Sequence, residues 1–199
     1  MKKLLFSAVA LVAFGFVNAQ EKSNGGFSKG DVFASGAVGF GSSKTDDVKS
    51  SSFTFAPAVG YFVTENIAAG ARLNFGSASE DVFQGTQMVE EKTSSFGLEA
   101  FARYYYTPAS QFSVYGELAI GVGSEKTEVG TGEYKEKTFG VNAGVGVSYF
   151  LNSNFAIEAG WAGLGYNTND NGGNGAPKTN DFGLNVDLSS VNFGLVYKF

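Results

Sequence analysis

The chain of 199 residues contains no cysteine and no histidine. Without cysteine it forms no disulfide, so the fold must be held together by burial and hydrogen bonding. Without histidine, catalytic arrangements of the Ser-His, Asp-His and Cys-His types and ordinary zinc sites are impossible. We therefore predict that the protein has no catalytic residues, no cofactor and no metal site, and that it is not an enzyme.

Positive charge and long apolar runs are also scarce. The formal net charge is −5 and the basic residues are scattered along the chain, which argues against nucleic acid as a partner. Beyond the N-terminus, no stretch reaches the roughly 18 to 20 apolar residues that a transmembrane helix needs. Proline occurs only 3 times, whereas glycine occurs 28 times and aromatic residues make up 15% of the chain. The chain is thus rich in glycine without a collagen-like period, and its aromatic content is high.

The N-terminus has the pattern of a secretory signal. Lys2 and Lys3 precede an apolar core from Leu4 to Val17, and small or compact residues occupy the expected cleavage positions up to Ala19. We predict a cleaved signal peptide at residues 1–19, a short periplasmic N-terminal segment at 20–29 and one β-barrel domain at 30–199.

Eight segments of the remaining chain carry large apolar residues at every second position. A strand sends alternate side chains to opposite faces, so each segment has one bulky apolar face and one face of small or polar residues. The seventh segment changes phase near Gly163, which indicates a β-bulge. The eighth segment breaks phase in its upper part, at Leu184, Val186 and Leu188.

The connections between these segments alternate strictly between short and long. Three are tight, at residues 63–66, 107–110 and 152–154, and four are long and polar, at residues 42–51, 77–94, 124–137 and 167–182. An up-and-down meander produces this alternation when all turns of one kind lie at one end. We predict an all-β fold, an eight-stranded antiparallel up-and-down transmembrane β-barrel with short periplasmic turns and long external loops. A soluble β-sandwich or lipocalin-like barrel would instead carry charged and polar residues on its exposed face.

Aromatic residues on the apolar face gather at both ends of the segments and predict two membrane girdles. The periplasmic girdle comprises Tyr61, Tyr106, Phe112, Tyr149 and Phe155. The outer girdle comprises Phe40, Phe53, Phe75, Phe96 and Phe139. A weak repeat with a period of one hairpin plus one long connection also marks the short turns. It aligns Tyr61 and Asn66 with Tyr106 and Gln111, and with Tyr149 and Asn154.

The opposite face carries the charged residues at midstrand, which predicts a charge cluster inside the barrel formed by Arg72, Glu99, Arg103, Glu117 and Glu158. Eight strands enclose a space that side chains can just fill, and buried charges are tolerated only when paired. Two interpretations stay open: a polar gate or narrow ion path, or a network that fills the lumen. Glu99 and Glu117 could act as paired carboxylates, but the lumen is too narrow for a glycan. Phe62, Tyr105 and Phe150 point inward beside the short turns and are predicted to plug the periplasmic end.

The signal, the eight alternating segments, the alternating connections and the terminal Phe199 resemble the small OmpA/OmpX-like outer-membrane β-barrel family, over essentially the whole mature chain. The resemblance implies a bacterial outer-membrane location and outer-membrane lipid as a partner. It further implies that Phe193, Leu195, Tyr197 and Phe199 form the signal read by the barrel-assembly machinery. The family includes adhesins, membrane stabilisers and narrow channels, so the resemblance fixes architecture rather than function.

Three functions therefore remain open. The first is a non-enzymatic integral outer-membrane protein that contributes to envelope integrity and presents its loops to an external protein or surface ligand, for adhesion or defence. The second is a narrow porin-like channel for ions or small solutes, and the third is a soluble secreted β-barrel that binds a ligand. We expect the protein to be a monomer.

Overall fold

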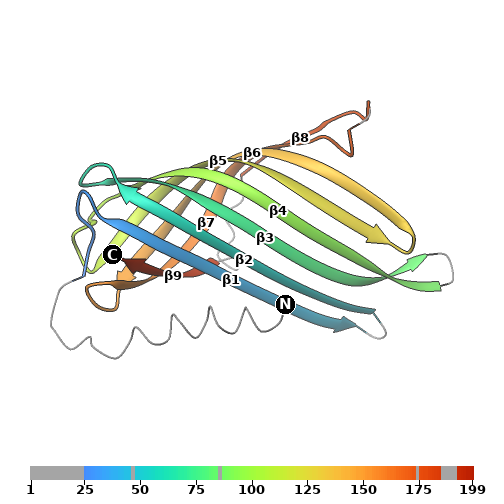
Figure 1. Cartoon of the computed structure of the whole chain (residues 1–199), viewed down its shortest axis with the longest axis horizontal. Coiled ribbons are helices and arrows are strands. Elements are labelled where there is room, and N and C mark those ends of the chain that lie inside the picture. Colours follow the sequence, from blue (N-terminus) through green and yellow to red (C-terminus); the bar gives the residue numbers. More distant parts are fainter. Residues whose placement is uncertain (1–24, 46–47, 85–86, 174, 185–191) are drawn as a thin grey trace.

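The computed structural model describes residues 25–45, 48–84, 87–173, 175–184 and 192–199, so the predicted signal peptide lies outside the described residues. Long strands make up most of the described chain (Figure 1). They are β1 (Val32–Thr45), β2 (Val48–Phe62), β3 (Ile67–Gln84), β4 (Gln87–Tyr105), β5 (Phe112–Val129), β6 (Gly132–Phe150), β7 (Phe155–Asn169), β8 (Thr179–Leu184) and β9 (Asn192–Lys198). The described part of the chain has no helix long and apolar enough to cross a membrane.

The strands form a closed antiparallel barrel. From β1 to β7 each strand pairs with the next along the chain. Both β8 and β9 pair with β7, β8 along residues 164–169 and β9 along residues 155–160, so together they occupy the eighth position in the wall. Residues 33–37 of β1 pair with residues 194–198 of β9, which closes the sheet. The predicted eight-stranded up-and-down barrel is confirmed.

The change of phase in the seventh segment is a β-bulge at the predicted residue. Ala143 of β6 pairs with Leu164 of β7, and Gly144 pairs with Ala162, so Gly163 is the extra residue. One inserted residue moves the following side chains to the other face. Leu164 and Tyr166 are therefore exposed on the outer wall. Val186 and Leu188 lie outside the described residues.

Three of the four long polar connections are mostly strand. The prediction of long loops is therefore wrong in extent for residues 42–51 and 77–94, whereas the charge alternation at 124–137 does indicate the hairpin that is found. Residues 170–173 and 175–178 of the fourth connection lie outside any strand. The β1–β2 pairing continues to Thr45 and Val48, and the β3–β4 pairing continues to Gln84 and Gln87. The β5–β6 pairing continues up to a two-residue turn at Gly130. Pairing satisfies the backbone hydrogen-bonding groups of these segments within the sheet. Their side chains are mostly polar on both faces, which fits hairpins whose two faces are both exposed. The barrel thus has one end with short turns, the short-turn end, and one end with extended hairpins, the hairpin end.

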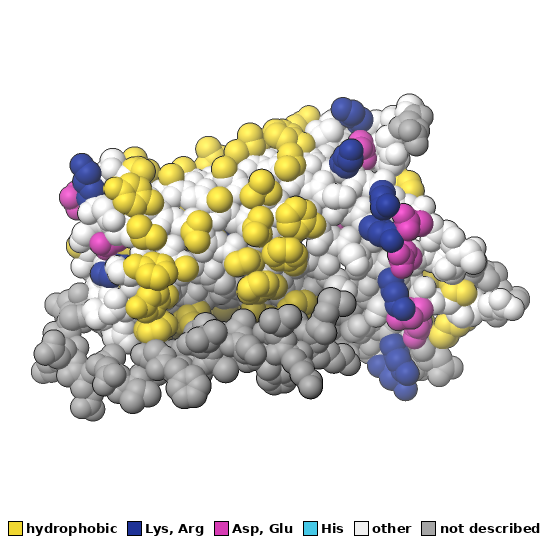
Figure 2. Space-filling view, viewed as in Figure 1, with side chains coloured by type: hydrophobic (Ala, Val, Ile, Leu, Met, Phe, Trp, Pro, Cys, Tyr) yellow, Lys and Arg dark blue, Asp and Glu magenta, His cyan; other side chains and the backbone are white. Residues whose placement is uncertain are grey.

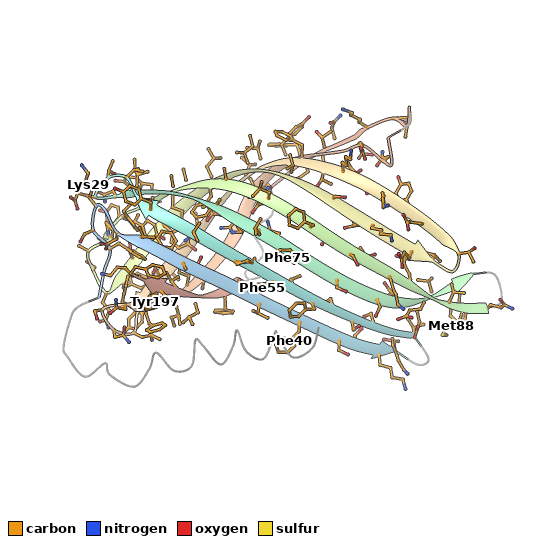
Figure 3. The ribbon with its side chains drawn as sticks, in the orientation of Figure 1. Lys29, Phe40, Phe55, Phe75, Met88 and Tyr197 are labelled. Carbon is orange, nitrogen blue, oxygen red and sulfur yellow. The ribbon has the colours of Figure 1, made fainter. Side chains whose placement is uncertain are left out.

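The outer wall carries the bulky apolar face that the alternation predicts. Figure 2 shows apolar side chains spread over the visible wall between charged residues at the two ends. Phe40, Phe55 and Phe75 lie on three neighbouring strands and are all exposed (Figure 3). Of the ten girdle residues, nine are exposed: Tyr61, Tyr106, Phe112, Tyr149, Phe40, Phe53, Phe75, Phe96 and Phe139. Phe155 is only 7% exposed, and its ring centroid lies 4.9 Å from that of Tyr197.

Each short turn is fastened to the end of a strand from the next hairpin by an amide side chain. The backbone carbonyl of Asn66 accepts a hydrogen bond from the backbone N–H of Tyr105 at 2.8 Å, and the side-chain amide of Asn66 donates to the Tyr105 carbonyl at 2.8 Å. The same two-bond clamp joins Gln111 to Phe150, and Asn154 to Lys198. These three amides are the aligned residues of the weak sequence repeat, so the repeat encodes a clamp that locks the base of the barrel.

We predict that Asn66→Leu lowers the free energy of unfolding by about 1–3 kcal/mol, because the Tyr105 carbonyl loses its side-chain donor while the shape of residue 66 is kept. The measurement is guanidinium unfolding of the barrel in detergent micelles, followed by tryptophan fluorescence. Glu65→Leu, at the exposed neighbouring position of the same turn, is the matched control. Equal effects of the two substitutions would argue against the clamp.

Candidate functional site in the barrel lumen

The five predicted charges lie together inside the barrel. Strand pairing places them there, because Arg72 of β3 is the direct partner of Glu99 of β4, and Arg103 of β4 is the direct partner of Glu117 of β5. Direct cross-strand partners share a face of the sheet, and in a closed barrel that face is the lumen. Glu158 reaches the same cluster from β7.

The cluster is a chain of alternating charges across the lumen. Arg72 donates to Glu99 at 3.1 Å and to both oxygens of Glu117, at 2.9 and 2.8 Å. The Nε of Arg103 donates to Glu117 at 2.6 Å, and its Nη1 donates to Glu158 at 2.9 Å. Three carboxylates facing two guanidiniums leave one net negative charge. Each charged side chain has at least one ion-pair partner, the condition under which such groups are tolerated inside a protein.

Within the charge cluster, burial increases from Glu99 and Arg72 to Arg103. The Glu99 side chain is 22% exposed and the Arg72 side chain 19%, whereas Arg103 is 5% exposed. The guanidinium of Arg103 lies 4.5 Å from the ring centroid of Tyr115 and 5.0 Å from that of Phe101. Aromatic faces attract a desolvated guanidinium, so these rings stabilise the driest cation of the cluster. The Tyr105 hydroxyl closes the chain by donating to Glu158 at 3.2 Å.

An aromatic plug fills the lumen between the charge cluster and the short-turn end. The predicted plug residues Phe62, Tyr105 and Phe150 are fully buried there. At their centre lies the ring of Phe27, which is 1% exposed and stands 4.6 Å from Phe62, 5.5 Å from Tyr105 and 4.8 Å from Phe150 between ring centroids. Phe33 of β1 completes the plug.

The sequence prediction missed the central residue of this plug. Phe27 belongs to the predicted periplasmic N-terminal segment at 20–29, yet it folds back into the barrel. Its N–H donates to the Pro108 carbonyl at 2.7 Å, and the ammonium of Lys198 donates to the Gly26 carbonyl at 2.6 Å. A Cβ on Gly26 would lie 2.5 Å from the backbone of Ala109. A large apolar residue after two glycines in an otherwise polar segment is the signal that could have identified it.

Glycines on the lumen wall provide space for the large rings. A Cβ at Gly60 would lie 2.3 Å from the ring of Phe33, and one at Gly146 would lie 2.3 Å from the ring of Tyr115. The rings therefore lie directly on bare backbone, as aromatic side chains do over strand glycines in other barrels. This pairing of small and large residues lets a narrow barrel enclose a dense aromatic core.

On the hairpin side of the cluster the lumen widens into a cavity of about 540 Å³, whose lining includes Ser35, Thr54, Asn74 and Asn142 beside the five charges. The cavity lining mixes these polar groups with small apolar residues such as Ala56 and Ala119, whereas the plug is aromatic. Among the described residues, no group of histidine, cysteine, aspartate and glutamate side chains has the arrangement of a metal site. The arrangement can hold water and ions above the cluster.

The residues of the predicted assembly signal lie on the strand that closes the barrel. Phe193, Tyr197 and Phe199 are exposed on the outer wall, and Leu195 is half-buried beside them. Tyr197 pairs with Ala34 of β1 and with Phe155 of β7. The backbone of Phe199 donates to the carbonyl of Val32 at 3.0 Å. Whether these residues are read by an assembly machinery stays a prediction.

The comparisons with known proteins concern the whole barrel. A family model described as "outer membrane protein beta-barrel domain" matches residues 7–199 of the chain. A comparison with curated protein sequences finds no match. The chain is similar to the N-terminal beta-barrel domain of OprF from Pseudomonas aeruginosa, with 13% identity and a TM-score of 0.50 over 87% of this chain and 100% of that chain. It is also similar to OprG from Pseudomonas aeruginosa, with 16% identity and a TM-score of 0.52 over 87% of this chain and 98% of that chain. Identities this low show a shared fold.

We predict that Arg103→Met destabilises the barrel by about 3–5 kcal/mol, because it leaves the buried carboxylate of Glu158 without its cation. Adding Glu158→Gln should restore part of the loss, since the remaining group is then neutral. Lys92→Met, which removes an exposed ion pair with Glu90, should cost less than about 1 kcal/mol. Guanidinium unfolding in micelles measures all three. If Arg103→Met and Glu158→Gln were simply additive, the two side chains would not be coupled.

Proposed function

Because this chain belongs to the outer membrane protein beta-barrel domain family, we propose that it is a closed, non-enzymatic barrel of the bacterial outer membrane. In this proposal the barrel contributes to envelope integrity and presents its hairpins to the exterior, where they contact an external protein or surface ligand. The short-turn end then faces the periplasm and the hairpin end faces outward.

The aromatic plug is the observation that carries this proposal. Five rings, from Phe27, Phe33, Phe62, Tyr105 and Phe150, pack together with centroid separations of 4.6–6.0 Å. An ion crossing this layer would lose its hydration shell among rings whose one polar group, the Tyr105 hydroxyl, is already hydrogen-bonded to Arg103 and Glu158. A barrel sealed in this way acts through its wall and its hairpins rather than through its lumen.

A narrow channel is the second candidate, and the gradient of burial in the charge cluster favours it. Glu99 and Arg72 are partly exposed to the cavity, so ions from the hairpin end can reach the cluster. Conduction would require the plug to move. The soluble binding protein is the least supported, because its outer wall would expose a broad band of large apolar side chains to water.

We predict that the purified full chain gives no conductance steps in a planar bilayer, since the plug leaves no hydrated path. Tyr106→Ala, which removes an exposed ring at the same end of the barrel, should be equally silent. Phe27→Ala should produce brief, small steps, because the ring at the centre of the plug is lost. Regular steps from the unaltered protein would refute the closed barrel and support the channel.

Because the protein has no native cysteine, the closure of the plug can also be tested by labelling introduced cysteines. Ser35→Cys, on the cavity wall, should react readily with a membrane-impermeant thiol reagent. Ser148→Cys, at a buried lumen position, should stay unmodified until Phe27→Ala is added. Rapid modification of Ser148→Cys in the otherwise unaltered barrel would show that water passes the plug.

A further inference from the structure

The outer wall at the hairpin end is layered. A lysine points outward on five of the first six strands, four residues beyond the end of the continuous apolar band and toward the hairpin end. The band ends at Phe40, Phe53, Phe96, Val122 and Phe139, and the corresponding lysines are Lys44, Lys49, Lys92, Lys126 and Lys135. We name these five lysines the lysine tier. On the same face, the exposed pair of Phe83 and Met88 lies farther out, near the tip of the β3–β4 hairpin. Figure 2 shows dark blue side chains in a band beyond the apolar wall.

Serine and acidic residues complete the layering. Two residues beyond the end of the apolar band, which on β3 is Phe75, lie Ser42, Ser51, Ser77, Ser94 and Ser124. Six residues beyond it lie four carboxylates, the acidic tier: Asp81, Glu90, Glu128 and Glu133. Asp46 and Asp47 have the same spacing in the sequence and lie outside the described residues. Lys137, two residues from Phe139, is the exception to the serine layer.

The inner face of the same hairpins, which is continuous with the lumen, carries acidic residues. Glu80 pairs directly with Glu91, and Glu125 pairs directly with Glu136, on the face continuous with the lumen. Between the charge cluster and the hairpin tips, every lysine in the described residues of β1 to β6 lies on the outer face. A merely solvated sheet would carry lysine on both faces. The confinement of lysine to the outer face indicates a partner that surrounds the barrel from outside.

The height of the lysine tier fits the headgroup layer of a membrane. Four residues span about 13 Å along a strand, which becomes roughly 9–11 Å along the membrane normal at a tilt of about 35–45°. The polar region on each side of the hydrocarbon core is about 5–8 Å deep. A lysine side chain reaches back by several ångströms along its stem. The ammonium groups thus come level with lipid phosphates.

Cross-strand pairing also concentrates positive charge. Lys44 and Lys49 are direct partners on β1 and β2, and Lys126 and Lys135 are direct partners on β5 and β6. Like charges in direct opposition destabilise a sheet unless an anion lies between them. Glu133 supplies that anion for the second pair, at 2.8 Å from each lysine, and these lysines lower the pKa of Glu133 to about 2. Among the described residues neither Lys44 nor Lys49 forms an ion pair with a side chain.

We propose that the lysine tier binds the phosphate groups of outer-leaflet lipid headgroups, with Lys44, Lys49 and Lys92 as the principal contacts. This inference rests on the proposed membrane location and not on the closed lumen. The acidic tier competes for the same ammonium groups, most directly at Lys126, which lies 2.5 Å from Glu128 and 2.8 Å from Glu133. Lipid phosphate and acidic tier are therefore alternative partners of that lysine.

The test is a titration of the full chain, in a neutral detergent with EDTA, against diphosphorylated lipid A, with bound lipid counted by native mass spectrometry. We expect the Lys44→Ser/Lys49→Ser/Lys92→Ser variant to bind at least about tenfold more weakly, since each lysine near an anionic surface contributes roughly fivefold. Lys29→Ser, an exposed lysine at the opposite end, should bind like the unaltered protein. A change in electrophoretic mobility on boiling confirms that each variant is folded.

Further measurements test whether the acidic tier competes with lipid phosphate, and whether the bound phosphate belongs to a lipid. Glu128→Gln/Glu133→Gln should bind lipid A more tightly, because Lys126 and Lys135 are released. Dephosphorylated lipid A should bind weakly, and inorganic phosphate at equal concentration should not displace lipid A. Unchanged affinity of the triple lysine variant, equal binding of dephosphorylated lipid, or displacement by inorganic phosphate would each overturn the proposal. A protein that fails to insert into vesicles at all would instead refute the membrane location.

Discussion

Closure of the sheet is the constraint on which the rest of the structure depends. Only five residues of β1, 33–37, pair with β9, yet this short ladder turns one face of the sheet into an enclosed lumen. Enclosure removes water from Arg103 and Glu158, so their charges must find partners within the wall. It also forces Phe33 of β1 inward, against the other rings of the plug. The clamp between Asn154 and Lys198 holds the closing strand at its end.

From the hairpin end to the short-turn end, the lumen becomes less accessible to water, and its side chains become less polar. Polar and small apolar side chains line the upper cavity, the paired charges form its base, and the neutral rings come last. The charges lie at the boundary because each needs both an opposite charge and some remaining hydration, and Arg103 replaces its lost hydration with the faces of Tyr115 and Phe101. The ion-pair cluster and the plug are therefore one continuous filling, in which the Tyr105 hydroxyl joins the two parts.

Alternation of residues predicted the barrel because a strand has only two faces, and a single inserted residue, Gly163, was visible as a change of phase. The same rule placed Arg72, Glu99, Arg103, Glu117 and Glu158 inside, but it could not give their pairing, which depends on strand register. Register is set by turn lengths and long-range pairing that no local pattern contains. The inward position of Phe27 has no period to reveal it, since it lies outside the strands, and only its place after two glycines in a polar segment marks it. The repeat around Asn66, Gln111 and Asn154 was visible, but its meaning required the partners Tyr105, Phe150 and Lys198.

An interior that satisfies its own charges has little capacity left for a ligand. Arg72 already uses both of its terminal nitrogens on carboxylates, and Arg103 uses its Nε and Nη1 in the same way. A solute entering the cavity would have to break these contacts to bind. The outer wall differs, because cross-strand pairs such as Lys44 and Lys49 bring like charges together without a described ionic partner on the protein. In the proposed outer-membrane setting, the outer wall rather than the lumen is therefore the surface suited to recognition, because among the described residues its paired Lys44 and Lys49 lack an ionic partner.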